Sequence, residues 1–269
     1  KSKKMKTYFI DAFKSEKFKG NPAAVCISDN EIDSRTMQNI ASEIGFSETA
    51  FIKQITDNTY IIRFFTPKIE IPLCGHATLA SSKIVFDTTL FDGIKFINCN
   101  SVELIIEKIG RKIKMQFPVY DTEEIEVPQR MLDALGVSQI VNKRYNTETK
   151  IILIDIESAS ELKKLQPDFT ALVNSYSGVN GVLVTAISDN QYYDFQYRYF
   201  WPWVGTNEDP VTGGVQTFLT KYWATKLNKT KLNAFQCSAR TGMMSTEIIK
   251  NKVYILGEAV TILEGQFKL

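Results

Sequence analysis

Apolar residues along this chain follow two spacings, and each spacing predicts one type of element. At helical spacing they recur in Asp33 to Glu43, along one side through Met37, Ile40 and Ala41, and again in Ala77 to Phe86. Runs of β-branched and aromatic residues with alternating polar positions predict strands. These runs cover Lys6 to Phe13, Ala23 to Ser28, Tyr60 to Phe65, Lys150 to Asp155 and Gly181 to Ile187. Helices and strands therefore mix along the whole chain.

A short pattern occurs twice. Arg-Phe-Phe-Thr-Pro stands at Arg63 to Pro67, and Arg-Tyr-Phe-Trp-Pro stands at Arg198 to Pro202, an offset of 135 residues. The same offset sets Cys74 to Thr78 opposite Asp209 to Gly213. The repeat predicts two similar halves that share one site, and halves of this length match the usual size of a domain. We expect the joint near Tyr120 to Glu126.

Composition narrows the class of protein. A chain of 269 residues with 44% hydrophobic content can bury a large core. Its 32 basic and 30 acidic residues leave a formal charge of +2, which calls for neither nucleic acid nor a membrane as a partner. No apolar run approaches the ~20 residues of a membrane span, and no apolar stretch typical of a signal peptide follows the first residues. We therefore expect a soluble, cytoplasmic protein.

Signals for a metal or a nucleotide cofactor are weak. The four cysteines, Cys26, Cys74, Cys99 and Cys237, have no paired spacing, which favours free thiols. His76 is the only histidine, so the chain offers few ligands for a zinc site. No glycine-rich phosphate-binding pattern follows a strand. We expect no metal and no cofactor.

Two predicted helices begin with residues that suit an anion site. Asp209-Pro210 has the features of a helix start, because aspartate accepts hydrogen bonds from exposed amides and proline suits the first helical position. Another helix is expected to begin at Cys74-Gly75-His76. If the halves are related by a twofold axis, both helix N-termini can point into one cleft. Their free amides would there favour a substrate with a carboxylate.

Five motifs, in this order, resemble those of the PhzF-like family of phenazine-biosynthesis isomerases. The motifs are Gly20-Asn21-Pro22-Ala23-Ala24-Val25, Ser47-Glu48-Thr49-Ala50-Phe51, Phe65-Thr66-Pro67 with Glu70, Leu73-Cys74-Gly75-His76-Ala77-Thr78, and Glu208-Asp209-Pro210-Val211-Thr212-Gly213. The resemblance implies an α+β fold of the diaminopimelate-epimerase type. In that fold two pseudo-symmetric domains each wrap a β-barrel-like sheet around a central helix. We expect domains at 1–120 and 121–261, with the strand at about 262–269 as a candidate to complete the first.

The resemblance also implies an activity. The family member of phenazine biosynthesis is a cofactor-free isomerase that moves a proton on a dihydro-hydroxyanthranilate ring, a small cyclic carboxylate. Its glutamate acid/base falls on Glu48, and its substrate-polarising residues fall on His76 and Asp209. The neighbouring positions expected to bind substrate are Gly75, Ala77, Thr212, Gly213 and Gly214. A homodimer is expected on the same ground.

Proton abstraction from carbon needs a base whose pKa lies near the working pH. We therefore expect the pKa of Glu48 to be raised, by partial burial and by Asp209 as a second carboxylate in the same cleft. Structural roles compete with these assignments. Glu48 could accept hydrogen bonds from turn amides, His76 and Asp209 could be helix caps, and Cys74 is expected to be a packing residue.

Three other functions stay open beside the isomerase. An amino-acid racemase or epimerase of this architecture uses one thiol from each half, but Asp209 stands opposite Cys74, which disfavours a two-thiol enzyme. A non-catalytic protein could bind a small carboxylate in the same cleft. The aromatic stretch Tyr192 to Trp203 could contact a partner, although sheet packing is the simpler interpretation. Gly214 replaces a serine that many family members have here, which leaves the substrate open.

Overall fold

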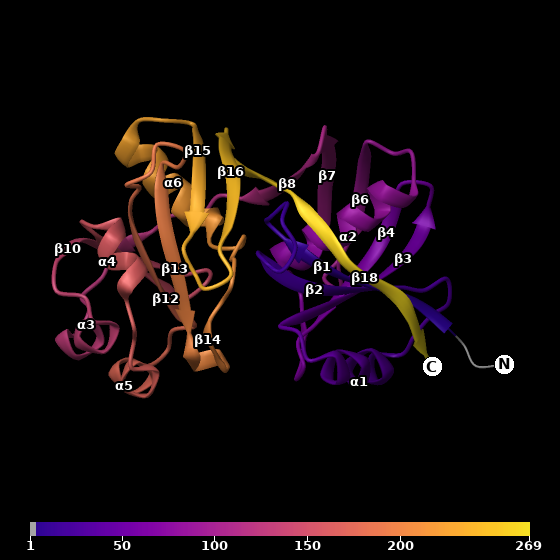
Figure 1. The fold of residues 1–269 in the computed structure, drawn as a ribbon, viewed down its shortest axis with the longest axis horizontal. Coiled ribbons are helices and arrows are strands. Elements are labelled where there is room, and N and C mark those ends of the chain that lie inside the picture. The colour runs from indigo at the N-terminus through magenta and orange to yellow at the C-terminus, as the bar shows by residue number, and fades with distance from the viewer. Residues whose placement is uncertain (1–3) are drawn as a thin grey trace. The chain divides into compact units, whose positions relative to one another are not determined.

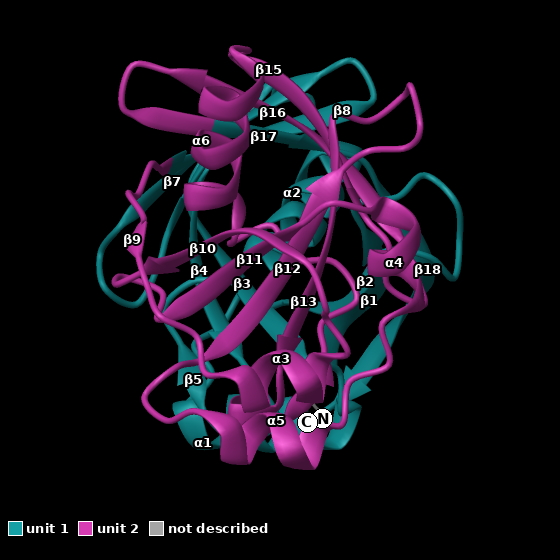
Figure 2. Cartoon of the chain, turned by 90° about the vertical axis from the view of Figure 1, so that its left-hand side faces the viewer, with its two compact units in different colours: residues 1–117, 254–269 teal, residues 118–253 magenta. Residues whose placement is uncertain are grey.

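The computed structural model describes residues 4–269 (Figure 1). The chain has an α+β fold and divides into two compact units (Figure 2). Unit 1 comprises the residues up to Phe117 together with Tyr254–Leu269, and unit 2 comprises Pro118–Val253. The C-terminal part of unit 1 thus starts earlier than the expected strand at about 262. Within residues 4–269, no helix is long and apolar enough to cross a membrane.

Unit 1 is built on one run of paired strands. β1 (Lys4–Ala12) pairs antiparallel with both β2 (Asn21–Ile27) and the C-terminal β18 (Ala259–Lys268), which runs beside it in Figure 1. The run continues through four strands, namely β3 (Glu48–Thr56), β4 (Thr59–Phe65), β6 (Gly93–Ile97) and β7 (Glu103–Ile109). Along it the pairs β2–β3 and β4–β6 are parallel, whereas β3–β4 and β6–β7 are antiparallel. β8 (Lys112–Pro118) pairs with β7, and the short β5 (Glu70–Ile71) pairs with β4.

Two helices cover this sheet in different ways. α2 (Gly75–Thr88) packs against β1, β2, β3 and β18, and nearly all of its residues from His76 to Phe86 are buried. α1 (Ser34–Ile44) is amphipathic, and its Met37, Ile40 and Ala41 pack against Phe51 and Phe65. The Asp33 carboxylate accepts from the backbone N–H of Thr36, which caps α1 as expected from an aspartate before an apolar run. α2 is therefore the central helix of unit 1.

Unit 2 repeats the same pairing order. β10 (Ile140–Asn146) and β11 (Ile151–Ile156) are antiparallel, β11 and β12 (Gly181–Ile187) are parallel, and β12 and β13 (Phe195–Trp201) are antiparallel. β15 (Lys231–Gln236) then pairs parallel with β13 and antiparallel with β16 (Gly242–Ile249). β14 (Thr206–Glu208) pairs with β13, and β9 (Glu123–Glu124) pairs with β10. The predicted repetition of one architecture in both halves is confirmed.

The helices of unit 2 lie between these strands in the sequence. They are α3 (Gln129–Leu135), α4 (Ala159–Lys164), α5 (Phe169–Ser175), the 3₁₀ turn η1 (Pro202–Val204) and α6 (Gln216–Leu227). α3, α4 and α5 contribute Met131, Leu162 and Leu172 to a core that also contains Ile154 and Val184 from the sheet. α6 follows β14 as α2 follows β5. β17 (Lys252–Gly257) spans the boundary between the units.

The predicted helix start at Asp209-Pro210 is wrong. α6 begins at Gln216, and Asp209 instead follows β14 and donates its backbone N–H to the carbonyl of Tyr199. The hydroxyl of Thr212 donates to the Asp209 carboxylate, which closes a turn on itself rather than capping a helix. Of the two helix starts expected to form an anion site, only the one at Cys74-Gly75-His76 is present.

Strand register also corrects the predicted offset of the repeat. In unit 1 Phe65 pairs with Glu70, and in unit 2 Phe200 pairs with Glu208. Glu70 lies seven residues after Arg63, whereas Glu208 lies ten residues after Arg198, because η1 is inserted between the two strands. The offset thus grows from 135 to 138 beyond this point. The position opposite Cys74 becomes 212 rather than 209.

Candidate active site

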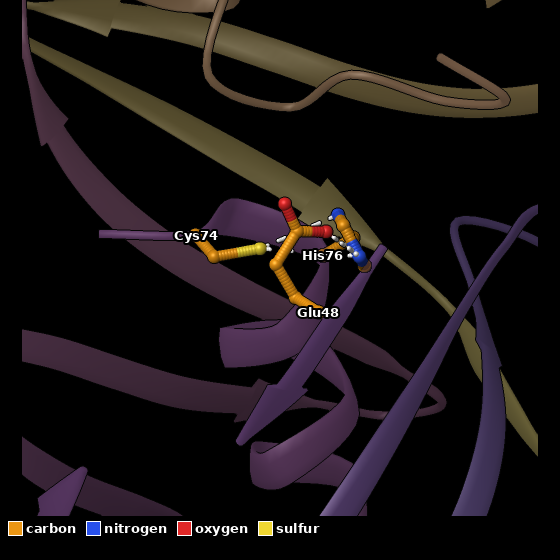
Figure 3. A group of neighbouring side chains, drawn as sticks. All are labelled: Glu48, Cys74 and His76. Atoms are coloured by element: carbon orange, nitrogen blue, oxygen red, sulfur yellow. Dashed lines mark hydrogen bonds and ion pairs between the residues drawn. The ribbon is translucent and has the colours of Figure 1, made fainter. Parts of the chain in front are cut away.

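Glu48 and His76 meet inside unit 1. Glu48 is the first residue of β3, and His76 is the second residue of α2. The carboxylate Oε2 of Glu48 lies 3.0 Å from Nε2 of His76, and Figure 3 shows the two side chains turned toward each other. Both residues are buried, with 5% and 6% of their surface exposed. Two of the three predicted catalytic residues therefore form one buried pair.

Other polar side chains contact both nitrogens of the His76 ring. The amide nitrogen of Asn21 lies 3.2 Å from Nδ1, and the thiol sulfur of Cys74 lies 3.4 Å from the same atom. On the opposite side, the hydroxyl of Ser47 lies 3.5 Å from Nε2. Sequence reasoning did not assign Asn21 or Ser47 to the site. Both stand inside the Gly-Asn-Pro and Ser-Glu-Thr motifs, so the signal that could have found them was present.

Local backbone geometry brings these residues together. Gly20 has φ +69°, and a Cβ there would lie 2.1 Å from the carbonyl oxygen of Ala12, so this turn requires glycine. The turn delivers the chain into β2 with Asn21 as its first residue. Cys74 has an extended backbone and acts as the N-cap residue of α2 without a side-chain cap bond. Its carbonyl accepts from the backbone N–H and from the hydroxyl of Thr78.

The pKa of Glu48 is lowered, so the prediction of a raised value is wrong. Burial alone raises the pKa of this carboxyl, but the charge of His76 and hydrogen bonds from His76 and Ser47 outweigh burial. In this arrangement Glu48 is ionised at neutral pH.

His76 shows the complementary shift. Burial lowers its pKa, but Cys74 and Glu48 raise it, and the resulting pKa lies well above the usual value for histidine. Burial raises the pKa of the Cys74 thiol, so this thiol is neutral near pH 7 and Glu48 is the partner whose charge acts on the imidazolium. The site therefore holds a buried carboxylate and imidazolium in contact.

Glu48, Cys74 and His76 also form a group with metal-ligand chemistry. Their ligand atoms lie within 4.8 Å of one another, and no other group of three such side chains occurs in residues 4–269. Metal binding would require the thiol and the imidazolium to lose their protons, against the direction of both pKa shifts. The arrangement thus fits proton transfer better than metal ligation.

Of the remaining predicted site residues, Gly75 and Ala77 flank His76 in α2, and the others lie around one turn of unit 2. Asp209 is buried, and the Gln236 side chain spans the turn, since its amide donates to the carbonyl of Asp209 and its oxygen accepts from the N–H of Thr212, both at 2.6 Å. Gly213 and Gly214 follow directly, before α6. A Cβ on Gly214 would meet nothing within 4 Å, so a serine would fit there. That Asp209 meets Glu48 in one site stays a prediction.

A family model described as phenazine biosynthesis-like protein matches residues 10–265. The chain belongs to this phenazine biosynthesis-like family. The resemblance drawn from five motifs is thereby confirmed. A relative from Halalkalibacterium halodurans, named an uncharacterized isomerase, is 40% identical over 266 residues, which cover 97% of this chain and 98% of the relative.

Solved structures give the same assignment. A crystal structure of a phenazine biosynthesis protein of the PhzF family from Enterococcus faecalis is 35% identical, with a TM-score of 0.92 over 99% of this chain and all of that one. A predicted epimerase from Pseudomonas aeruginosa, 17% identical, has a TM-score of 0.75 over 98% of this chain and 99% of its own, which shows the shared fold alone. The phenazine biosynthesis-like family and its epimerase-like fold are therefore established, and together they support an isomerase.

Proposed function

We propose that this protein is a cofactor-independent isomerase that moves a proton on a small cyclic carboxylate, such as a dihydro-hydroxyanthranilate. The observation that carries this proposal is the buried Glu48–His76 pair, with 3.0 Å between Oε2 and Nε2. A carboxylate and an imidazolium held out of water supply a proton acceptor and a proton donor at one point. The name isomerase of the Halalkalibacterium halodurans relative is consistent with such a reaction.

The lowered pKa of Glu48 suggests how the base becomes active. The carboxylate is ionised before substrate binds, but its contact with His76 weakens it as a base. A substrate oxygen that takes over the N–H of His76 removes this contact, and burial then raises the pKa of Glu48. The substrate would thus generate the stronger base that carbon deprotonation needs.

The proton balance of the reaction is simple. Glu48 takes a proton from one ring carbon, and the electron pair of the broken C–H bond shifts through the adjacent double bond. His76 donates a hydrogen bond to the substrate oxygen on which negative charge develops. Glu48 then returns the proton to a different carbon, so that the product is an isomer and no redox partner is consumed.

The other assignments follow from the family motifs. We propose Asp209 as a residue that binds and polarises the substrate. Gly75, Ala77, Thr212, Gly213 and Gly214 would contact the substrate, and the absence of a side chain at the three glycines would leave the backbone there open to it. A cytoplasmic location and a homodimer remain parts of this proposal.

Proton NMR in D2O tests the function directly. Trans-2,3-dihydro-3-hydroxyanthranilate is incubated with the wild type, with Glu48→Gln and with Glu43→Gln, whose side chain is exposed on α1. We expect isomerisation with deuterium uptake in the wild type and the Glu43→Gln control, but not in Glu48→Gln. Full turnover by Glu48→Gln would contradict the role of Glu48.

A non-catalytic binding protein and a racemase or epimerase would give different results in this type of assay. Binding of the substrate without exchange in any variant would indicate a non-catalytic carboxylate-binding protein. Exchange at the α-carbon of an amino acid would indicate a racemase or epimerase. Strand register makes a two-thiol racemase a weak alternative, because the position opposite Cys74 is Thr212, which has no thiol.

A further inference from the structure

The contacts of His76 differ between its two nitrogens. Nε2 lies beside the Glu48 carboxylate at 3.0 Å, whereas Nδ1 lies beside the Asn21 amide at 3.2 Å. Asn21 is fully buried, and the turn at Gly20, which requires glycine, fixes the point at which β2 begins. The mechanism proposed above uses Nε2 and leaves the role of the Nδ1 side open.

We propose that Asn21 is a positioning residue that determines which nitrogen of His76 carries the proton. The proposal rests on the proposed function, because it concerns the same Glu48–His76 pair. When the ring is neutral, one nitrogen bears a hydrogen and the other accepts a hydrogen bond. An Asn21 N–H that donates to Nδ1 therefore keeps the ring hydrogen on Nε2, directed at Glu48 or at a substrate oxygen.

An amide is suited to this task in both charge states of the ring. In the imidazolium both nitrogens bear hydrogen, so Nδ1 needs an acceptor. A half-turn of the Asn21 amide presents its oxygen in place of its nitrogen. The ring can then gain or lose a proton without leaving its buried Nδ1 unsatisfied, which would cost about 1 to 3 kcal/mol. A carboxylate or an alkyl group at this position would serve only one state or neither.

The other groups facing the ring do not provide this function. Cys74 also lies near Nδ1, at 3.4 Å, but a neutral thiol is a weak hydrogen-bond donor and acceptor. Ser47 and Glu48 face Nε2. Glu48 and Cys74 are the titratable groups with contacts to the ring. The ionised Glu48 carboxylate can only accept, and the Cys74 thiol can donate or accept only weakly, whereas the Asn21 amide is a full donor on one side and a full acceptor on the other.

The single histidine of the chain makes the test direct. Protein labelled with ¹⁵N in histidine gives one imidazole signal set, and long-range ¹H–¹⁵N spectra across pH report both the tautomer and the pKa of His76. We expect the wild type to titrate to the Nε2–H tautomer. Asn21→Leu, which has a similar shape, should lower the pKa and mix the tautomers. Asn21→Asp, which can only accept at Nδ1 when ionised, should raise the pKa.

Shifts of the His76 pKa in opposite directions in Asn21→Leu and Asn21→Asp would distinguish a positioning role of Asn21 from a purely structural one. Asn98→Leu is the matched control, since the Asn98 amide is also buried in unit 1 but bonds to Pro72 and to the backbone of Asn100 and Val102. It should leave the His76 spectrum unchanged. If Asn21→Leu does not fold, Asn21→Asp still decides the question. An unchanged tautomer and pKa in the Asn21 variants would overturn the proposal.

Turnover provides a second readout. If the proposed function holds, Asn21→Leu should lower kcat about tenfold or more with little change in KM, because the donor is misoriented while the cleft keeps its shape. The spectra do not depend on turnover. A wild type without isomerase activity whose tautomer still responds to Asn21 would refute the function and leave the positioning role standing.

Discussion

Unit 1 and unit 2 have the same strand order, but the first residue of β3 and the equivalent first residue of β12 differ in their chemistry. Glu48 starts β3 and pairs with Ala23 of the parallel neighbour, and Gly181 starts β12 and pairs with Ile151 in the same way. In unit 2 the Tyr199 ring occupies the space beside this position, so that a Cβ on Gly181 would lie 2.6 Å from it. One unit presents a buried acid there, and the other presents an aromatic ring. The repeat therefore preserves the scaffold while the chemistry diverges.

The part that the units share is an arginine clamp between two strands. Arg63 binds Glu70 through two hydrogen bonds of 2.7 and 2.6 Å, and Arg198 binds Glu208 through two of 2.7 Å. Each guanidinium also lies over an aromatic ring two residues along its strand, at 5.1 Å in unit 1 and 4.9 Å in unit 2. A bidentate pair of this kind fixes the orientation of the short strand that precedes each central helix. It is a structural device rather than part of the candidate site.

Removing the Glu48 carboxylate should give the largest effect, a loss of activity. We expect Glu48→Gln to lower kcat for proton exchange by about 10²- to 10⁴-fold, the range typical of general acid–base catalysis. Steady-state rates in D2O measure this, with Glu43→Gln as the control. A loss confined to KM would mean that Glu48 only binds the substrate.

Filling the corresponding position of unit 2 should destabilise the fold. Gly181→Ala forces a methyl group against Tyr199 and the carbonyl of Phe200, and overpacking of this kind costs about 1 to 3 kcal/mol. Gly93→Ala is the matched control, because its nearest neighbour to a new Cβ is 4.0 Å away. Urea unfolding of both variants compares them. Equal stability would show that the Tyr199 ring moves aside freely.

The two arginine clamps should differ in strength. Arg198 is 9% exposed and also donates to the carbonyls of Leu162 and Leu165. Arg63 is more exposed, and beside Glu70 it donates to the hydroxyl of Ser34. We expect Arg198→Lys to cost about 2 kcal/mol and Arg63→Lys about 1 kcal/mol, because lysine cannot form the fork. Chemical unfolding measures both. The reverse order would contradict the role given to burial.

The smallest effect is expected in the pH dependence of stability. The lowered pKa of Glu48 contributes stability above its unfolded pKa of about 4.3, and this is lost as the pH falls through the folded value. The raised pKa of His76 contributes stability below its unfolded pKa of about 6.5, and this is lost as the pH rises through the folded value. The difference in unfolding free energy between wild type and Glu48→Gln should therefore be largest between these limits. A difference that is flat with pH would contradict the ion pair.

Local patterns predicted the elements that bury either one regular face or nearly their whole length. α1 and β12 match the segments expected from periodicity, because each buries one face or all of its residues against the sheet. β10 was not predicted, since its side chains from Ile140 to Tyr145 are partly buried or exposed without a period of two. The helix start at Asp209 failed for a different reason. Gln236, far along the chain, holds the turn that a local capping pattern had suggested was a helix.

The candidate site was predictable in part of its membership, since Asn21 and Ser47 were missed, and its electrostatics were not predictable. The motifs named Glu48 and His76, and the structure brings the two side chains together. Their direct contact depends on where β3 and α2 begin in space, which no local pattern encodes. The sign of the Glu48 pKa shift follows from that contact, so it could not be obtained from burial alone.

Because of β18, unit 1 cannot complete its sheet until all of unit 2 has been synthesised. It follows all of unit 2 in the sequence, yet it pairs along β1 from Lys4 to Ala12. On the ribosome, where residues emerge one after another, unit 2 has its complete sequence before unit 1 has its final strand. β1 thus waits for a partner that is made much later. A chain released from the ribosome before residue 259 would carry β1 as an open sheet edge, exposed to pairing with other chains.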